Sequence, residues 1–138
     1  MHTLTLPMPP SANRCWRTSA RGGKAITYIS DTAKSYRAAV ALAYAVSYGF
    51  PMPQDEPIRM TIEVYPQRPK DWAKRLKAEG PLWHRSVRSL DLDNHLKVLC
   101  DALIGIAYVD DKQVLDISIK RRPPTGKARC IVTWEEIE

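Results

Sequence analysis

The sequence contains no apolar run near the length of about 20 residues that a membrane-spanning helix needs, and we expect no membrane partner. Residues 1–10 lack a charged lead followed by an apolar stretch, so we also expect no signal peptide. Only three cysteines occur, Cys15, Cys100 and Cys130, and none belongs to a C-x-x-C pair. An odd number of isolated cysteines favours reduced thiols over disulfides or a zinc site. Together these absences predict a cytoplasmic protein.

The sequence signatures of phosphate loops, serine hydrolases and zinc proteases are also missing. There is no glycine-rich phosphate loop, no G-x-S-x-G and no H-E-x-x-H. What is present is a chain of 138 residues with 44% hydrophobic content, which is enough for one core. We expect a single domain over residues 1–138, with a basic loop insertion at about residues 67–89.

Basic and acidic residues are segregated along the chain, whose net charge is +6. Residues 12–24 carry four basic side chains and no acid, and residues 67–90 carry seven basic and two acidic ones. Residues 120–129 form a third basic cluster, whereas residues 91–116 hold six acids and two lysines. A basic surface around an acidic pocket suits a polyanion bound outside and a metal cation bound inside, although a solvated surface has the same composition. The segregation favours nucleic acid, and we expect no small-molecule substrate.

Hydrophobic periodicity predicts four strands and two helices. Alternating apolar residues predict strands at residues 2–7, 58–65, 113–120 and 127–135. Apolar residues three and four apart predict helices at residues 31–48 and 91–105, the first capped by Ser30 or Asp31. The intervening polar segments, 8–29 and 67–89, are predicted loops, with a brief extended piece at 25–29 and a helical turn near 72–79.

This order, β–α–β–α–β–β, indicates an α+β fold in which two helices pack against a small mixed sheet. The short link at residues 121–126 suggests that the last two strands form a hairpin.

The most informative stretch is the acidic one that begins the second helix. Asp91 and Asp93 are two residues apart, so they converge only if Asp91 precedes the first turn in an extended conformation. Lys97 follows Asp93 by four residues, and the two side chains share one face of the helix. Acids at a helix start followed by lysine are also a common stabilising arrangement, so these residues alone do not decide between a site and a surface.

Asp110 and Asp111 lie beyond that helix and are a second acidic pair. Residues 106–111 can return to the helix start, about 21 Å away, only along a nearly extended or bent path. The alternative is that the acidic turn meets the helix start of a neighbouring subunit. Carboxylates drawn together in either way need a cation, and oxygen ligands favour Mg²⁺ or Mn²⁺. Which of the two acids faces inward is open at this point.

These motifs resemble one known family. D-L-D-N-x-x-K-x-x-x-D-A-L at residues 91–103, followed by V-D-D-x-Q-V at 109–114, is similar to the RusA family of Holliday junction resolvases. The opening L-P-M-P-P-S-A-N-R at residues 6–14 also resembles the family's first strand and the loop after it.

The resemblance implies a Mg²⁺-dependent homodimer that nicks two strands of a four-way DNA junction symmetrically, with Mn²⁺ as a substitute metal. It implies that Asp91, Asp93 and Asp111 hold the metal and that Lys97 is also needed for catalysis. We expect the protein to be nucleoid-associated when it is bound to DNA.

We further expect basic and polar residues of the first two basic clusters to contact the DNA backbone without reading bases. They are Asn13, Arg14, Arg17, Arg21, Lys24, Lys70 and Arg75. The alternative to an enzyme is a non-catalytic, structure-selective DNA-binding protein, in which the acids only cap a helix and form a turn.

Overall fold

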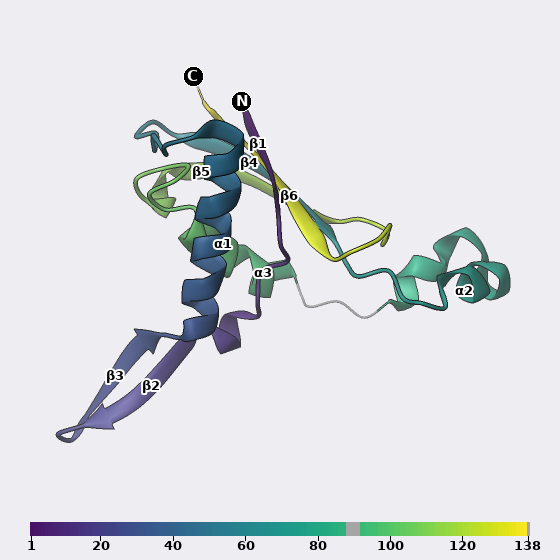
Figure 1. Ribbon diagram of the computed structural model, residues 1–138, viewed down its shortest axis with the longest axis horizontal. Coiled ribbons are helices and arrows are strands. Elements are labelled where there is room, and N and C mark those ends of the chain that lie inside the picture. Colours follow the sequence, from purple (N-terminus) through teal and green to yellow (C-terminus); the bar gives the residue numbers. More distant parts are fainter. Residues whose placement is uncertain (88–91, 138) are drawn as a thin grey trace.

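The computed structural model describes residues 1–87 and 92–137, and a mixed four-stranded sheet lies at its centre (Figure 1). The strands are β1 (His2–Leu6), β4 (Ile58–Tyr65), β5 (Val114–Arg121) and β6 (Arg129–Glu136), and their order in the sheet is β1-β6-β4-β5. Strand β6 runs antiparallel to β1 and β4, whereas β5 runs parallel to β4. The four predicted strands and the α+β class are confirmed.

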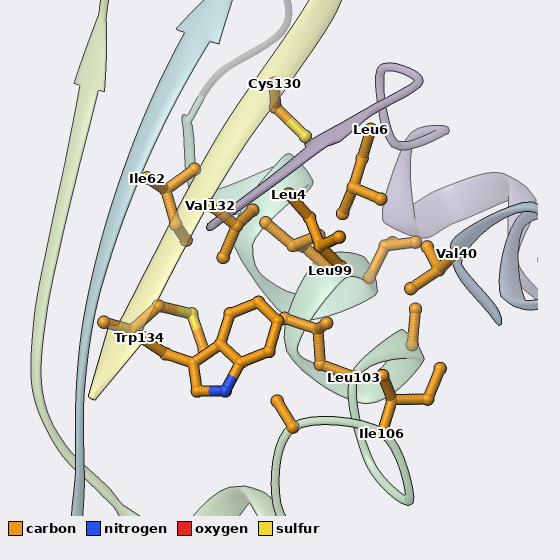
Figure 2. Packing of buried hydrophobic residues seen from close by; sticks show 14 of the residues in the cluster. Leu4, Leu6, Val40, Ile62, Leu99, Leu103, Ile106, Cys130, Val132 and Trp134 are labelled. Carbon is orange, nitrogen blue, oxygen red and sulfur yellow. The ribbon is translucent and has the colours of Figure 1, made fainter. Parts of the chain in front are cut away.

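Helices α1 (Asp31–Tyr48) and α3 (Leu92–Ala102) pack on the inward side chains of this sheet. Helix α1 begins at Ser30, whose hydroxyl accepts the Ala33 N–H at 3.3 Å, as an N-cap does. Figure 2 shows side chains of β1 and β6 converging with Leu99 and Leu103, at the end of α3, in one core. That core holds α3, the helix with the acidic motif, against the sheet. Among the described residues, no helix has the length and apolar character to cross a membrane.

The predicted hairpin between the last two strands is wrong. Strand β4 lies between β5 and β6 and pairs with both: Ile62 is opposite Ile119 on one side and Val132 on the other. Alternation defines the inward face of a strand but not its neighbours in the sheet. As an edge strand, β5 leaves Leu115 70% and Ile117 39% exposed.

The prediction for residues 8–29 is wrong in part: the brief extended piece at 25–29 is confirmed, but the loop assigned to the residues before it contains a further strand. Strands β2 (Trp16–Arg21) and β3 (Lys24–Ile29) form an antiparallel ribbon that projects from the rest of the protein (Figure 1). The turn consists of Gly22 and Gly23, whose φ angles of 57° and 76° suit glycine. Two glycines between six-residue extended segments are a hairpin signal, which the prediction of a loop overlooked.

Residues 67–89 hold more structure than the predicted basic loop. Helix α2 (Trp72–Glu79) and the 3-10 helix η2 (Gly80–Ser86) form an arm on the side away from the ribbon (Figure 1). The rings of Trp72 and Trp83 pack together with their centroids 6.5 Å apart, and Arg68 lies 4.6 Å over Trp72. The helical turn predicted near residues 72–79 is confirmed as helix α2, whereas the 3-10 helix η2 was not predicted.

Candidate active site

The candidate residues on α3 share one face of the helix. Asp93 lies in the first turn and Lys97 one turn later, and both are exposed. Asp101, which is half-buried, occupies the next position of the same series, because residues four apart lie above one another on a helix. The opposite face of α3 packs into the core. Asp91, the remaining predicted ligand on this segment, lies outside the described residues.

Asp110 and Asp111 have different roles in their turn. The Asp110 carboxylate accepts the Lys112 N–H at 2.9 Å and caps the 3-10 helix η3 (Asp111–Gln113). This hydrogen bond, helped by the neighbouring Asp111 carboxyl, lowers the pKa of Asp110. The Asp110 carboxyl in turn raises the pKa of Asp111, whose side chain is exposed. Asp110 therefore helps to form the turn, and the side chain of Asp111 is exposed beside it.

Gln113 holds this turn in place from both ends of its side-chain amide. The amide oxygen accepts the N–H groups of Val109 at 2.9 Å and Asp110 at 2.8 Å. The amide nitrogen donates to the carbonyls of Gln54 at 2.7 Å and Glu56 at 2.9 Å. The conformation of the acidic turn therefore depends on one side chain that sequence reasoning included in a motif but gave no role.

Asp101 is a second residue to which sequence reasoning gave no role. Its negative charge contributes to the raised pKa of Asp111, and also to those of Cys100 and Tyr108, so it lies near the acidic turn. Its spacing of four residues from Lys97 is the sequence signal that could have identified it. Asp101 and Asp111 therefore both lie near the C-terminal end of α3.

The acidic turn stays beside the C-terminal end of α3, whereas Asp93 lies at the N-terminal end. The chain leaves α3 in a compact turn, where the Gly105 N–H donates to the Tyr108 carbonyl at 2.7 Å. The Tyr108 hydroxyl donates to the Cys100 carbonyl at 2.6 Å, which ties the turn to the last part of the helix. Helix α3 has 11 residues, so its ends are about 15 Å apart. A connection of this shape is not the extended one that would return Asp111 to Asp93 within one chain.

Within residues 1–87 and 92–137, no three histidine, cysteine, aspartate or glutamate side chains gather closely enough to hold a metal ion. Of the candidate acids that the structure describes, Asp93 lies at the N-terminal end of α3, whereas Asp111 lies near its C-terminal end.

Lys97 contacts an aromatic ring. Its Nζ lies 4.6 Å from the centroid of the Trp16 ring, at the base of the ribbon. In the described part of the chain, no carboxylate oxygen lies within 4.0 Å of this ammonium group. Among the described residues, Lys97 is therefore in contact with an aromatic ring and not with a carboxylate.

His95 joins α3 to the N-terminal loop. Its ring is 2% exposed, and Nδ1 lies 3.2 Å from the Pro9 carbonyl oxygen. Because a carbonyl only accepts, Nδ1 carries the proton and donates. Burial lowers the pKa of His95 despite this hydrogen bond, so the ring is neutral at pH 7. The proline-rich loop and the acidic helix are thus fixed to one another.

Most of the predicted DNA contacts are exposed, as a backbone-binding surface requires. The exposed ones are Asn13, Arg14, Arg17, Lys24 and Lys70. Arg75 is half-buried, and its Nε lies 3.0 Å from Asp71 in the arm. The side chain of Arg21 lies outside the described part of the structure. At the root of the ribbon, Arg17, Tyr28 and Lys34 line an open hollow of about 410 Å³ beside the start of α1.

Comparison with known proteins decides the family of a chain with this helix, turn and basic surface. The family model described as endodeoxyribonuclease RusA matches residues 7–134. The chain belongs to the RusA family. It is therefore an endodeoxyribonuclease by family, and the resemblance seen in its motifs is confirmed.

Individual relatives agree with the family assignment. The crossover junction endodeoxyribonuclease RusA of Escherichia coli K12 is 30% identical over 141 residues, which cover 99% of this chain and 95% of the relative. The enzyme of the same name from enterobacteria phage 82 is 31% identical over 139 residues, covering 97% and 93%. The uncharacterized protein YqaN of Bacillus subtilis is 33% identical over 110 residues, covering 76% and 75%.

Proposed function

We propose that this RusA-family chain is a Mg²⁺-dependent homodimeric endonuclease that resolves four-way DNA junctions by symmetric phosphodiester cleavage. The observation that carries the proposal is the exposed face of α3, on which Asp93 and Lys97 lie one turn apart with the acidic turn at its end. Two of the relatives named above, those of Escherichia coli K12 and enterobacteria phage 82, are crossover junction endodeoxyribonucleases, which supports the junction as substrate.

The donor atoms of the candidate site fit a hard divalent cation. Asp93 and Asp111 offer exposed carboxylate oxygens, and Asp91 would add a third carboxylate. Oxygen-only ligation suits Mg²⁺, with Mn²⁺ as a substitute, and it does not suit zinc or copper. When bound, such a cation supplies charge neutralisation at the scissile phosphate and activates a water molecule.

The residues of the chain have separate tasks in this reaction. Asp91, Asp93 and Asp111 hold the cation, and Lys97 places its ammonium group against the charge that develops on the phosphate or the leaving oxygen. Asn13, Arg14, Arg17, Arg21, Lys24, Lys70 and Arg75 bind backbone phosphates. These contacts position the junction but do not read its sequence.

A second copy of the chain accounts for the distance between the acids. Symmetric cleavage of a junction calls for two sites related by a two-fold axis, which a homodimer provides. Because Asp93 and Asp111 are near opposite ends of α3, we propose that each site combines Asp93 of one copy with Asp111 of the other. This choice follows from the compact turn after α3, which makes a return within one chain unfavourable.

The proposed function is tested with an end-labelled synthetic four-way junction and a linear duplex of matched sequence. Each is incubated with Mg²⁺ or with a chelator, using the wild-type protein, Asp93→Asn and Asp116→Asn. Asp116 lies on β5, outside the site, and its carboxylate is 2.9 Å from the Arg59 side chain. Asp116→Asn makes the same chemical change as Asp93→Asn. We expect paired nicks near the crossover with the wild type and Asp116→Asn, and none with Asp93→Asn or the chelator.

Two other results would contradict the proposal. Tight junction binding without cleavage, unaffected by Mg²⁺ and by Asp93→Asn, would instead support the non-catalytic DNA-binding protein. Equal cleavage of the junction and the linear duplex would leave a nuclease without junction specificity.

A further inference from the structure

The contact between Lys97 and Trp16 joins two parts of the molecule that are far apart in sequence. Trp16 is the first residue of β2, at the base of the ribbon, where it pairs with Ile29 of β3. Lys97 lies in the middle of α3, and its Nζ is 4.6 Å from the centroid of the indole. An ammonium group at this distance over an indole face is attracted by the negative charge of the ring face.

The backbone next to Trp16 is fixed to the start of α1. The Cys15 side chain is 1% exposed, and the Cys15 carbonyl accepts the Ser30 N–H at 2.9 Å. The Ser30 hydroxyl donates to the Arg14 carbonyl at 2.6 Å. These bonds hold the residues before Trp16 on one side, and its pairing with Ile29 holds it on the other. The indole therefore has little freedom to move away from α3.

The indole also fills the space between three elements. Together with residues of α1 and α3, it lines a cavity of only about 10 Å³, which leaves almost no free volume around it. Val98 and Asp101 of α3 and Tyr36 of α1 are among the lining residues. Trp16 is half-buried, so one part of the ring packs inward while the ring face supports Lys97.

An aromatic ring has a specific advantage as the support of a catalytic lysine. A carboxylate partner would fix the ammonium group but would also neutralise its charge. The indole face attracts the ammonium without adding a negative charge or a strong acceptor, so the N–H donors of Lys97 remain available for phosphate oxygens. Lysine otherwise has a long flexible chain that loses much rotamer freedom when it is held in one place.

We propose that Trp16 is a positioning residue, which holds the Lys97 ammonium in place for phosphodiester cleavage. The inference rests on the proposed function for the role of Lys97 and goes beyond it in assigning Trp16. It also gives the ribbon a second role: its strands present Arg17 and Lys24 to DNA, and its base holds the lysine.

Two substitutions separate the ring face from the bulk of the side chain. Trp16→Phe keeps an aromatic face, whereas Trp16→Leu keeps an apolar side chain without one. We expect Trp16→Leu to lower the single-turnover cleavage rate of a bound four-way junction by about tenfold or more, as misplaced catalytic groups do. We expect junction affinity, measured with Ca²⁺ in place of Mg²⁺, to stay within about twofold. Trp16→Phe should keep most of the rate.

A matched control comes from another cation–aromatic pair of the same chain. Arg129 of β6 lies 4.2 Å over the ring of Tyr65 of β4, away from α3. Tyr65→Leu removes a ring face from a cation in the same way, and we expect it to leave the cleavage rate unchanged. If Trp16→Leu lowers the melting temperature, Trp16→Met repeats the test with a longer and more flexible side chain of similar volume.

The contact itself is tested without any activity measurement. The Cε carbon of Lys97 carries the Nζ that lies over the indole. We therefore expect the resonances of the Cε protons to shift upfield in the wild type and in Trp16→Phe, and to return to ordinary values in Trp16→Leu. The absence of this shift in the wild type would overturn the proposal even if the protein cleaves junctions. A wild-type rate in Trp16→Leu, or a loss that appears only as weaker binding, would also overturn it. If the shift is present but no junction is cleaved by the wild type, the proposed function fails and the positioning role fails with it.

Discussion

Gln113 and Asp110 are joined by a hydrogen bond of 2.8 Å from the Asp110 N–H to the Gln113 amide oxygen. The same oxygen accepts the Val109 N–H, and the amide nitrogen of Gln113 donates to two carbonyls of residues 54–56. One side chain therefore joins the acidic turn to the segment before β4. Since Asp111 follows directly, the position of this candidate ligand depends on an uncharged neighbour.

We expect Gln113→Glu to disturb this turn although it changes the shape of the side chain very little. The carboxylate keeps the acceptor but replaces the donor with an oxygen that faces two carbonyl oxygens. Leaving these groups unsatisfied should lower the free energy of unfolding by about 2 kcal/mol. Urea unfolding measures this change, and the junction cleavage rate should fall in the same variant.

Gln67→Glu is the matched control for that substitution. Gln67 accepts the Ala128 N–H at 3.1 Å through its amide oxygen, a contact that glutamate can also make. We expect a change well below that of Gln113→Glu. Equal effects of the two substitutions would show that Gln113 has no special role in holding the turn.

The basic face of the ribbon predicts how junction binding depends on salt concentration. Arg17 and Lys24 lie on the same face of the ribbon, because Arg17 pairs with Tyr28 and alternate residues of a strand share a face. We expect Arg17→Ala combined with Lys24→Ala to weaken junction binding and to reduce the salt slope of log K by about 1–2. The cleavage rate of the saturated complex should change little.

Arg59→Ala is the control for this loss of charge. Arg59 lies on β4 and pairs with Asp116 at 2.9 Å, so its removal lowers the net charge without touching the ribbon. We expect its salt slope to match that of the wild type. If Arg59→Ala lowers the salt slope by half as much as the double ribbon variant does, the effect is one of overall charge and the ribbon has no special role.

Two thiols, the half-buried Cys100 and the buried Cys130, predict how stability depends on pH. Burial raises the pKa of Cys100 to about 11 and that of Cys130 to about 12, from 9.0. A raised pKa means that the folded state keeps the proton while the unfolded state loses it above pH 9. The stabilisation is therefore complete below pH 9 and is lost as the pH rises toward 11 for Cys100 and 12 for Cys130.

Each thiol should contribute a slope of about 1.4 kcal/mol per pH unit within its own range. We expect chemical denaturation to show a falling free energy of unfolding above pH 9, and Cys130→Ala to reduce the slope between pH 9 and 12 by about that amount. An unchanged slope in Cys130→Ala would contradict a raised pKa of Cys130 as a source of this pH dependence.

The sequence predicted the parts of the fold that depend on local periodicity. The alternation in residues 58–65 and the helical spacing in residues 31–48 identified β4 and α1, because each buries one regular face. Strand neighbours depend on how all four strands pair with one another, and this is a property of the whole sheet. For this reason the order of β4, β5 and β6 could not be derived from their own residues.

The candidate site could likewise be predicted from the sequence only in part. Asp93 and Lys97 could be predicted because helix geometry relates residues four apart. The contact of Lys97 with Trp16 could not be predicted, since 80 intervening residues connect them and their meeting depends on the packing of the ribbon base against α3. The position of Asp111 depends on the Gln113 and Tyr108 hydrogen bonds, which sequence spacing does not reveal.

A mixing experiment tests the central claim, a metal site shared between two copies, most directly. Asp93→Asn and Asp111→Asn are each prepared, unfolded together in equal amounts and refolded, and the mixture is assayed on a four-way junction with Mg²⁺. Each variant alone should be inactive. In a heterodimer, one site would combine the intact Asp93 of one copy with the intact Asp111 of the other. Half of the dimers would then carry one working site of two, so the mixture should recover about a quarter of the wild-type sites. A mixture as inactive as its components, beside a refolded wild type that cuts, would contradict the account.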